Sequence, residues 1–184
     1  GSWLCWWLKR LGARVAGIAL SPATEPSLFE ASGLASEIRS VVQDVRDAAG
    51  VAEAFRTHRP HVVFHLAAQS LVREGYRRPA ETFETNVSGT VNCLEAARHC
   101  DSVRAVVVVT SDKCYEERNL GRPYREEDAL GGHDPYAASK ACAEIVTQAY
   151  RRSYFEAGPV LVASVRAGNV IGGGDWSADR LVPD

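Results

Sequence analysis

The feature that most constrains this chain is the run Ala-Val-Val-Val-Val-Thr at residues 105–110. It is almost pure valine, and β-branched side chains favour strands over helices. An apolar run that does not alternate with polar residues is typical of a strand covered on both faces, as in a parallel sheet between layers of helices. The run therefore predicts a parallel sheet flanked by helices.

Other segments repeat this pattern, because short apolar runs alternate with helical patterns along the whole chain. The alternation predicts an α/β fold with a doubly wound parallel sheet, Rossmann-like, with helices on both faces. No internal repeat or linker interrupts it, so residues 1–184 are expected to form one domain. We expect strands at 13–20, 40–43, 61–65, 105–110 and 160–165, and helices at 3–11, 28–38, 51–58, 79–99 and 136–154.

Charge and apolar content exclude several classes of protein. Lys and Arg number 21 against 23 Asp and Glu, and no basic run is present, so nucleic acid is not an expected partner. No apolar stretch approaches the roughly 18 residues of a membrane span. The opening segment lacks the basic residues and the cleavage site of a signal peptide, so a cytoplasmic protein is expected. The 5 cysteines form no Cys-x-x-Cys pair and are odd in number, which indicates reduced thiols. We expect no metal site, since His61 and His65 flank a strand rather than share a helix face.

Tyr136 and Lys140 stand four residues apart in the pattern Tyr-x-x-x-Lys, which places them on one face of the helix expected at 136–154. Tyrosine, with a reference pKa of about 10, is a poor base at neutral pH unless a nearby cation stabilises its phenolate. Lys140 can supply that cation and can also bond the ribose of a cofactor. The pair is therefore a candidate for proton transfer.

In combination with Asp44, the Leu66-Ala67-Ala68 turn and Asn86, this pair resembles the extended short-chain dehydrogenase/reductase superfamily. The resemblance covers essentially the whole chain. It implies that the residue Asp44 meets adenine, that the small turn passes beside a dinucleotide, and that Asn86 stabilises the helix geometry. The residues that it implies for binding NAD are Gly1, Asp44, Val45, Leu66, Ala67, Ala68, Asn86, Tyr136, Lys140 and Ala167.

The two ends of the chain bear on how much of such a domain is present. Gly1 looks like the tail of a glycine-rich phosphate turn, and the chain contains no methionine. We therefore expect a fragment: a partial dinucleotide-binding domain that lacks the first strand, most of the glycine-rich turn and most of a C-terminal substrate lobe. The segment Ala19-Leu20-Ser21 holds no carboxylate to select NAD over NADP, so NAD is implied by the resemblance.

The segment Ser111-Asp112-Lys113 narrows the resemblance to the sugar-nucleotide 4,6-dehydratases, and within them to the branch that acts on CDP-glucose. The resemblance implies conversion of CDP-glucose to its 4-keto-6-deoxy product through bound NAD. Tyr136, assisted by Ser111 and Lys140, would take the C4 hydroxyl proton, and Asp112 would act as the acid. Lys113 holds the place of the base, a role that requires desolvation because the reference pKa of lysine is about 10.4.

The same resemblance implies a substrate site and a subunit contact. Gln69, Asn169 and Arg180 are the expected substrate residues, and a homodimer is expected through the helices at 79–99 and 136–154. Two alternatives remain open at this point: a dehydratase or epimerase for another nucleotide sugar, and a noncatalytic nucleotide-binding protein of the same fold. Product analysis distinguishes them.

Overall fold

The computed structural model of the chain describes residues 1–118 and 121–179. The chain divides into two compact units. The first unit comprises residues 1–44 together with the segment from Asn169 onward, and the second unit comprises residues 45–168. Each is described separately below.

The first unit contains a parallel two-stranded sheet. Helix α1 (Ser2–Arg10) leads to strand β1 (Ala16–Ala19), and β2 (Arg39–Val42) pairs with β1 so that Ala16 lies opposite Arg39. The helix expected at 28–38 is divided into α2 (Leu28–Ala31) and α3 (Leu34–Glu37). Gly33 between them has φ of 69°, a left-handed conformation that glycine adopts without steric cost and that interrupts the helix.

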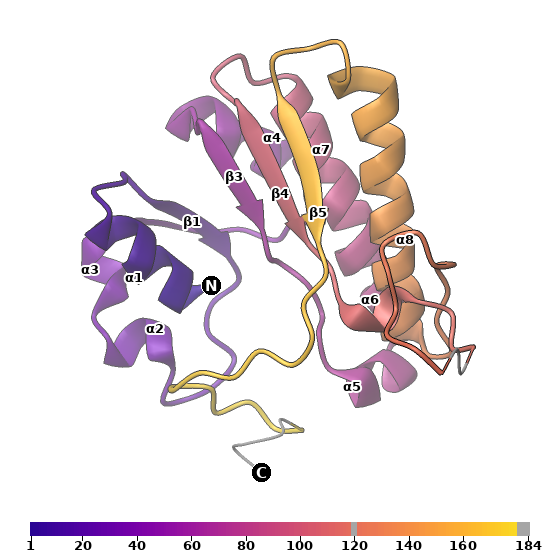
Figure 1. Cartoon of the computed structure of the whole chain (residues 1–184). Coiled ribbons are helices and arrows are strands. Elements are labelled where there is room, and N and C mark those ends of the chain that lie inside the picture. The colour runs from indigo at the N-terminus through magenta and orange to yellow at the C-terminus, as the bar shows by residue number, and fades with distance from the viewer. Residues whose placement is uncertain (119–120, 180–184) are drawn as a thin grey trace. The chain divides into compact units, whose positions relative to one another are not determined.

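The second unit is built on a three-stranded parallel sheet (Figure 1). Its strands are β3 (Val62–His65), β4 (Ala105–Val109) and β5 (Leu161–Val165), in the order β3-β4-β5. The valine run forms the central strand, and the side chains of Val106 and Val108 are each 1% exposed. The α/β class with parallel sheets and flanking helices is thereby confirmed.

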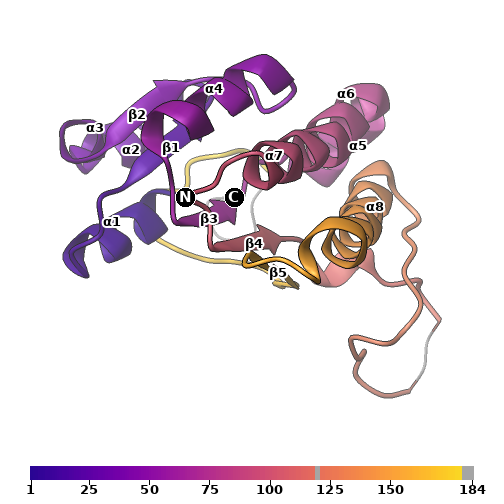
Figure 2. The ribbon, with the colours of Figure 1, turned by 90° about the horizontal axis from the view of Figure 1, so that it is seen from above.

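Helices cover one face of this sheet. Figure 2 shows α7 (Gly89–Arg98) and α8 (Pro135–Tyr150) on the same side of the three strands, where α7 contacts β4, α8 contacts β5, and α4 (Ala48–His58) packs on α7. On the other face, Phe64, Leu161 and Val165 are 37%, 75% and 45% exposed. The described helices of the second unit that contact this sheet therefore pack on a single face of it.

The helix expected at 79–99 is one continuous column of three parts. Helix α6 (Pro79–Phe83) passes through a π turn, η1 (Glu84–Ser88), into α7. Helix α8 likewise continues as a π turn, η3 (Arg151–Phe155). A short helix that the sequence did not predict, α5 (Val72–Arg77), precedes α6, and a 3-10 turn, η2 (Asp112–Cys114), follows β4.

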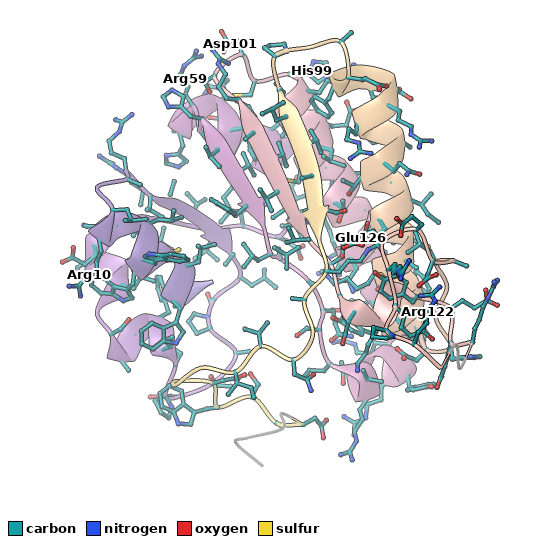
Figure 3. The ribbon with its side chains drawn as sticks, in the orientation of Figure 1. Arg10, Arg59, His99, Asp101, Arg122 and Glu126 are labelled. Carbon is teal, nitrogen blue, oxygen red and sulfur yellow. The ribbon has the colours of Figure 1, made fainter. Side chains whose placement is uncertain are left out.

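The amino-terminal ends of the strands are tied by surface charges. Arg59, which ends α4, forms a salt bridge with Asp101 before β4, with 2.9 Å between Nη2 and Oδ1 (Figure 3). This pair lies at the opposite end of the sheet from the carboxyl ends of the strands, where ligands bind in such folds.

No helix within residues 1–118 and 121–179 combines the length and apolarity that a membrane crossing requires.

The beginning of α8 is fixed by three local features. Asp134 caps it by accepting a hydrogen bond from the backbone N–H of Ala137 at 3.0 Å, and Pro135 occupies the first helical position. Gly132 packs directly on the first turn: a Cβ atom there would lie 2.5 Å from the nitrogen of Ala138 and 2.6 Å from the carbonyl carbon of Ala137. The helix can therefore approach this segment only because residue 132 has no side chain.

We predict that Gly132→Ala lowers the free energy of unfolding by about 1–3 kcal/mol, because the new methyl group must displace helix backbone. Urea unfolding followed by circular dichroism measures this. Gly158→Ala is the matched control, since its nearest neighbour would be the Phe155 carbonyl oxygen at an ordinary 3.6 Å. Equal unfolding midpoints for the two variants would show that the close approach of Gly132 is not important.

Candidate active site

Polar side chains gather after the carboxyl ends of all three strands of the second unit. Gln69 follows β3, Thr110 and Ser111 follow β4, and Arg166 follows β5. Because parallel strands end at the same edge of a sheet, these residues share one edge, and this is the edge where ligands bind in open α/β folds.

Ser111 organises the segment after β4. It is 5% exposed, and its Oγ accepts a hydrogen bond from the backbone N–H of Lys113 at 3.2 Å and donates one to Asp112 Oδ1 at 3.3 Å. The backbone N–H of Asp112 in turn donates to the carbonyl of Ala167 at 3.0 Å. The side chains of Asp112 and Lys113 are exposed. One turn therefore buries a hydroxyl and presents an acid and an amine to solvent.

Tyr136 and Lys140 lie in the first two turns of α8, as predicted. Tyr136 is half-buried, and Lys140 is buried with its Nζ donating to the carbonyl of Val109 at 3.0 Å. Burial lowers the pKa of Lys140 to about 8, whereas the nearby carboxylate of Glu144 acts in the opposite direction. Lys140 is thus anchored to the end of β4, two residues before Ser111.

His65, at the end of β3, is a buried neutral neighbour of Lys140. Its Nε2 lies 3.1 Å from Thr90 Oγ1, whose hydroxyl donates to the carbonyl of Asn86 at 2.7 Å, so we assign the imidazole proton to Nε2. Burial, together with the charge of Lys140, lowers the pKa of His65 to about 4. At neutral pH the imidazole is therefore uncharged and does not repel Lys140.

Asn86 connects the turn after β3 to α8. It lies in η1 with a side chain that is 1% exposed. Its Oδ1 accepts from the backbone N–H of Gln69 at 2.8 Å, and its Nδ2 donates to the Gln69 carbonyl at 2.9 Å and to Ser139 Oγ at 2.8 Å. Ser139 Oγ then donates to the carbonyl of Tyr136 at 2.7 Å. The role predicted for Asn86 in cofactor binding stays a prediction, and these bonds describe a positioning role.

The side chain of Gln69 is also used within the turn. Its Nε2 donates to Thr82 Oγ1 at 2.9 Å and to the Leu71 carbonyl at 3.1 Å, while its Oε1 accepts from the Leu71 N–H at 2.6 Å. These bonds hold the turn between β3 and α5. Contact of Gln69 with a substrate stays a prediction.

The structure places most of the predicted site residues in one unit. The second unit holds the expected catalytic residues and much of the expected cofactor site, whereas Gly1, Asp44 and Asn169 belong to the first unit, and Arg180 lies outside the described residues. The members in the second unit are Val45, Leu66, Ala67, Ala68, Gln69, Asn86, Ser111, Asp112, Lys113, Tyr136, Lys140 and Ala167.

Two residues with prominent contacts were given no catalytic or binding role from the sequence, namely Glu144 and Arg166. Glu144 accepts hydrogen bonds from Thr110 and Ser164 and forms a salt bridge of 3.1 Å with Arg166. A signal for Glu144 was present, because it follows Lys140 by four residues and places a carboxylate on the same helix face. For Arg166 the sequence offers only its position after a strand.

Comparisons with known proteins agree with this geometry. The family described as GDP-mannose 4,6 dehydratase matches residues 1–163. The CDP-glucose 4,6-dehydratase of Salmonella typhimurium is 50% identical over 189 aligned residues, which cover 100% of this chain and 53% of that protein. A dTDP-glucose 4,6-dehydratase of Escherichia coli is 33% identical over 60% of this chain and 36% of its own length. The chain thus spans about half the length of these relatives.

Solved structures of enzymes that act on nucleotide sugars share this fold. A UDP-glucose 4-epimerase of Thermus thermophilus, in complex with NAD, superposes with a TM-score of 0.82 at 31% identity, over 97% of this chain and 55% of that one. The dTDP-glucose 4,6-dehydratase of Streptomyces venezuelae, a double mutant with NAD bound, gives a TM-score of 0.81 at 26% identity. The match covers 98% of this chain and 56% of that one.

We predict that Asn86→Ala lowers the free energy of unfolding by about 3 kcal/mol, because it leaves buried groups of Gln69 and Ser139 without their partner. The matched control is Asn92→Ala on α7, whose amide donates at 2.8 and 3.1 Å to the carbonyls of Val45 and Arg46 nearer the surface. We expect that control to cost about 1 kcal/mol. Chemical denaturation of both variants tests the difference, and similar losses would contradict the special role of Asn86.

Proposed function

The chain belongs to the GDP-mannose 4,6 dehydratase family, and from this membership we propose that it is the dinucleotide-binding part of a CDP-glucose 4,6-dehydratase. One observation carries the substrate assignment: the 50% identity to the Salmonella CDP-glucose enzyme extends over the whole chain. The Asp112-Lys113 pair after β4 supports the same branch. The activity belongs to the complete enzyme, whose C-terminal part would supply the substrate lobe.

We propose NAD as the cofactor, and the residues of the second unit fit it. Ala67 and Ala68 follow β3 with small half-buried side chains, so a dinucleotide can approach the backbone there. Lys140 offers a buried ammonium that can bond ribose hydroxyls. From the first unit, Gly1 and Asp44 are the proposed contacts to pyrophosphate and adenine. NAD, when bound, would supply a reversible hydride acceptor, so that the conversion would involve no net oxidation.

The first chemical task of the protein residues is removal of the C4 hydroxyl proton. We assign it to Tyr136, whose phenolate is stabilised by the charge of Lys140 and oriented with help from the hydroxyl of Ser111. The anchoring of Lys140 to the Val109 carbonyl keeps its charge near the end of β4. The ketone that forms at C4 makes the C5 proton acidic.

The second task is loss of water across C5 and C6. Asp112 is the proposed acid that protonates the departing C6 hydroxyl, and its exposed carboxyl can reach a substrate above the strand ends. Lys113 lies at the place of the base that takes the C5 proton. A lysine needs desolvation for this role, and the side chain of Lys113 is exposed in the structure, so the bound substrate would have to provide that desolvation.

The test is product analysis of the complete enzyme with CDP-glucose and NAD. We expect a 4-keto-6-deoxy product, and we expect Tyr136→Phe to lower kcat by about 10²–10⁴-fold because it removes the proton-transfer group. Lys113→Ala in the same assay tests whether Lys113 is the base: if it is, exchange of the C5 proton with solvent is lost while oxidation at C4, followed as NADH, persists.

Two other outcomes would redirect the assignment. Turnover of a different nucleotide sugar, but not of CDP-glucose, would keep the family and replace the substrate. Binding of NAD without turnover of any nucleotide sugar would favour a noncatalytic nucleotide-binding protein of this fold.

We further propose that the enzyme is a cytoplasmic homodimer that pairs through the α6–α7 column and α8. The support is that these helices pack on one another and still carry exposed apolar side chains, Phe83 at 36% and Ile145 at 55% exposure. The free thiols of all five cysteines fit a reducing compartment.

We predict that Ile145→Lys weakens the dimer by at least about tenfold in Kd, because it places a charge in an apolar helix contact. Sedimentation velocity of the complete enzyme measures the monomer fraction. Val170→Lys is the control, since Val170 is 83% exposed and lies outside these helices. If both variants stay dimeric, the subunits pair through another surface.

A further inference from the structure

The buried carboxylate of Glu144 has no part in the chemistry assigned above. It lies on α8 with a side chain that is 5% exposed. Thr110 Oγ1 donates a short hydrogen bond to its Oε1, and Ser164 Oγ and Arg166 Nη2 donate to its Oε2 at 2.8 and 3.1 Å. One side chain of the catalytic helix therefore contacts residues at the carboxyl ends of both β4 and β5.

Arg166 extends this contact to the segment after Asp112 and Lys113. Its Nη1 donates to Tyr115 Oη at 2.8 Å and to the carbonyl of Glu126, labelled in Figure 3, at 3.1 Å. Its guanidinium also lies 4.8 Å from the centre of the Tyr115 ring, and Tyr115 stacks on Tyr124 at 4.8 Å. Arg166 thus links α8 to Tyr115, at the beginning of the segment that follows η2, and to Glu126, further along it.

Burying an ion pair costs free energy unless its remaining atoms are hydrogen-bonded, and here they are. Burial raises the pKa of Glu144, but the hydrogen bonds from Arg166, Thr110 and Ser164 outweigh this and lower it overall. Burial likewise disfavours the charge of Arg166, yet its bonds to Glu144 and Tyr115 raise its pKa. Both groups are therefore charged at neutral pH.

We propose that Glu144 is the positioning residue of the catalytic helix: it fixes α8 to the ends of β4 and β5 through Thr110, Ser164 and Arg166, and it presents a permanent negative charge to Lys140. The inference rests on the proposed function in one respect, since it gives the lysine that stabilises the Tyr136 phenolate its charge partner. Glu144 acts through Lys140 and β4 and does not touch the reacting atoms.

Few other charges oppose or assist Glu144 at Lys140. Tyr136 lies one turn away from Lys140 on α8, and β3 contributes His65, which is neutral. The turn η2 contributes Asp112, whose side chain is exposed, and Cys114, where burial raises the pKa of the thiol to about 11.

The acids on the other elements packed on α8 face arginines instead of Lys140. Glu74 and Glu81 face Arg78, Glu84 faces Arg46, and Glu95 faces Arg98. The negative charge of Glu144 therefore favours the protonated form of Lys140, and its removal favours the neutral amine.

The protonation state of Lys140 can be followed directly, because the chain contains only three lysines, Lys9, Lys113 and Lys140. Lysine labelled with ¹³C at Cε gives three NMR signals, and Lys140→Arg assigns the one of interest. In Glu144→Gln we expect the titration midpoint of Lys140 to lie below the midpoint measured for the wild-type chain, because the carboxylate that raises the pKa of Lys140 is gone. The matched control is Ser164→Ala, which removes one hydrogen bond to the same carboxylate but keeps its charge, and we expect no shift.

Glu144→Gln leaves Arg166 without its ion pair and can unfold the chain, so the double variant Glu144→Gln with Arg166→Gln, which buries no single charge, is measured as well. The same downward shift is expected there. In the complete enzyme we expect Glu144→Gln to lower kcat about tenfold or more with little change in KM. We also expect the alkaline limb of the pH profile of kcat to move to lower pH.

An unchanged midpoint for Lys140 in both Glu144 variants would overturn the inference, whatever their activity. The NMR titration needs no turnover, so the two proposals fail separately. A shifted midpoint in a protein that turns over no nucleotide sugar would refute the dehydratase and support the role of Glu144. Turnover of CDP-glucose with an unshifted midpoint would support the dehydratase and refute the role of Glu144.

Discussion

The amide of Asn86 is the contact on which the remainder of the candidate site depends. An amide side chain presents a donor and an acceptor side by side, as a backbone does, and Asn86 uses them to pair with both backbone groups of Gln69. The turn after β3 thus gains the pairing that a neighbouring strand would provide. Through Ser139 the same amide reaches the carbonyl of Tyr136, so one residue positions both the end of β3 and the tyrosine to which we assign proton transfer.

The site also keeps one cation, the ammonium group of Lys140, in a place from which water is largely removed. Lys140 is buried, donates to the Val109 carbonyl and has a neutral histidine and an ionised glutamate as neighbours. An acid and an amine, Asp112 and Lys113, stay on the exposed side of Ser111. Buried groups can hold a fixed electrostatic environment, whereas exposed groups change theirs when a ligand covers them.

Much of this was predictable from local patterns. The valine run, the Tyr-x-x-x-Lys helix and the polar residues after strand ends identified the sheet, the helix and the edge where they meet. Other features depend on contacts between distant residues. The apolar character of Phe64 and Leu161 predicts burial, whereas the two residues are 37% and 75% exposed in the structure. The described helices that contact the sheet, α7 and α8, lie on its other face. The spacing of Glu144 from Lys140 was visible in the sequence, but its partners at the ends of β4 and β5 were not.

The π turn in the α6–α7 column has a consequence for how related sequences are compared. Residues spaced by four drift about 40° around a regular α-helix at each step, but a π turn is wider and reverses part of that drift. Thr82, Asn86 and Thr90 can therefore all be buried on one face, at 0%, 1% and 2% exposure. Deleting a single residue between 84 and 88 would restore the narrower turn and rotate Asn86 relative to Thr90. Among homologues, a one-residue gap in this segment would thus matter more than many substitutions around it.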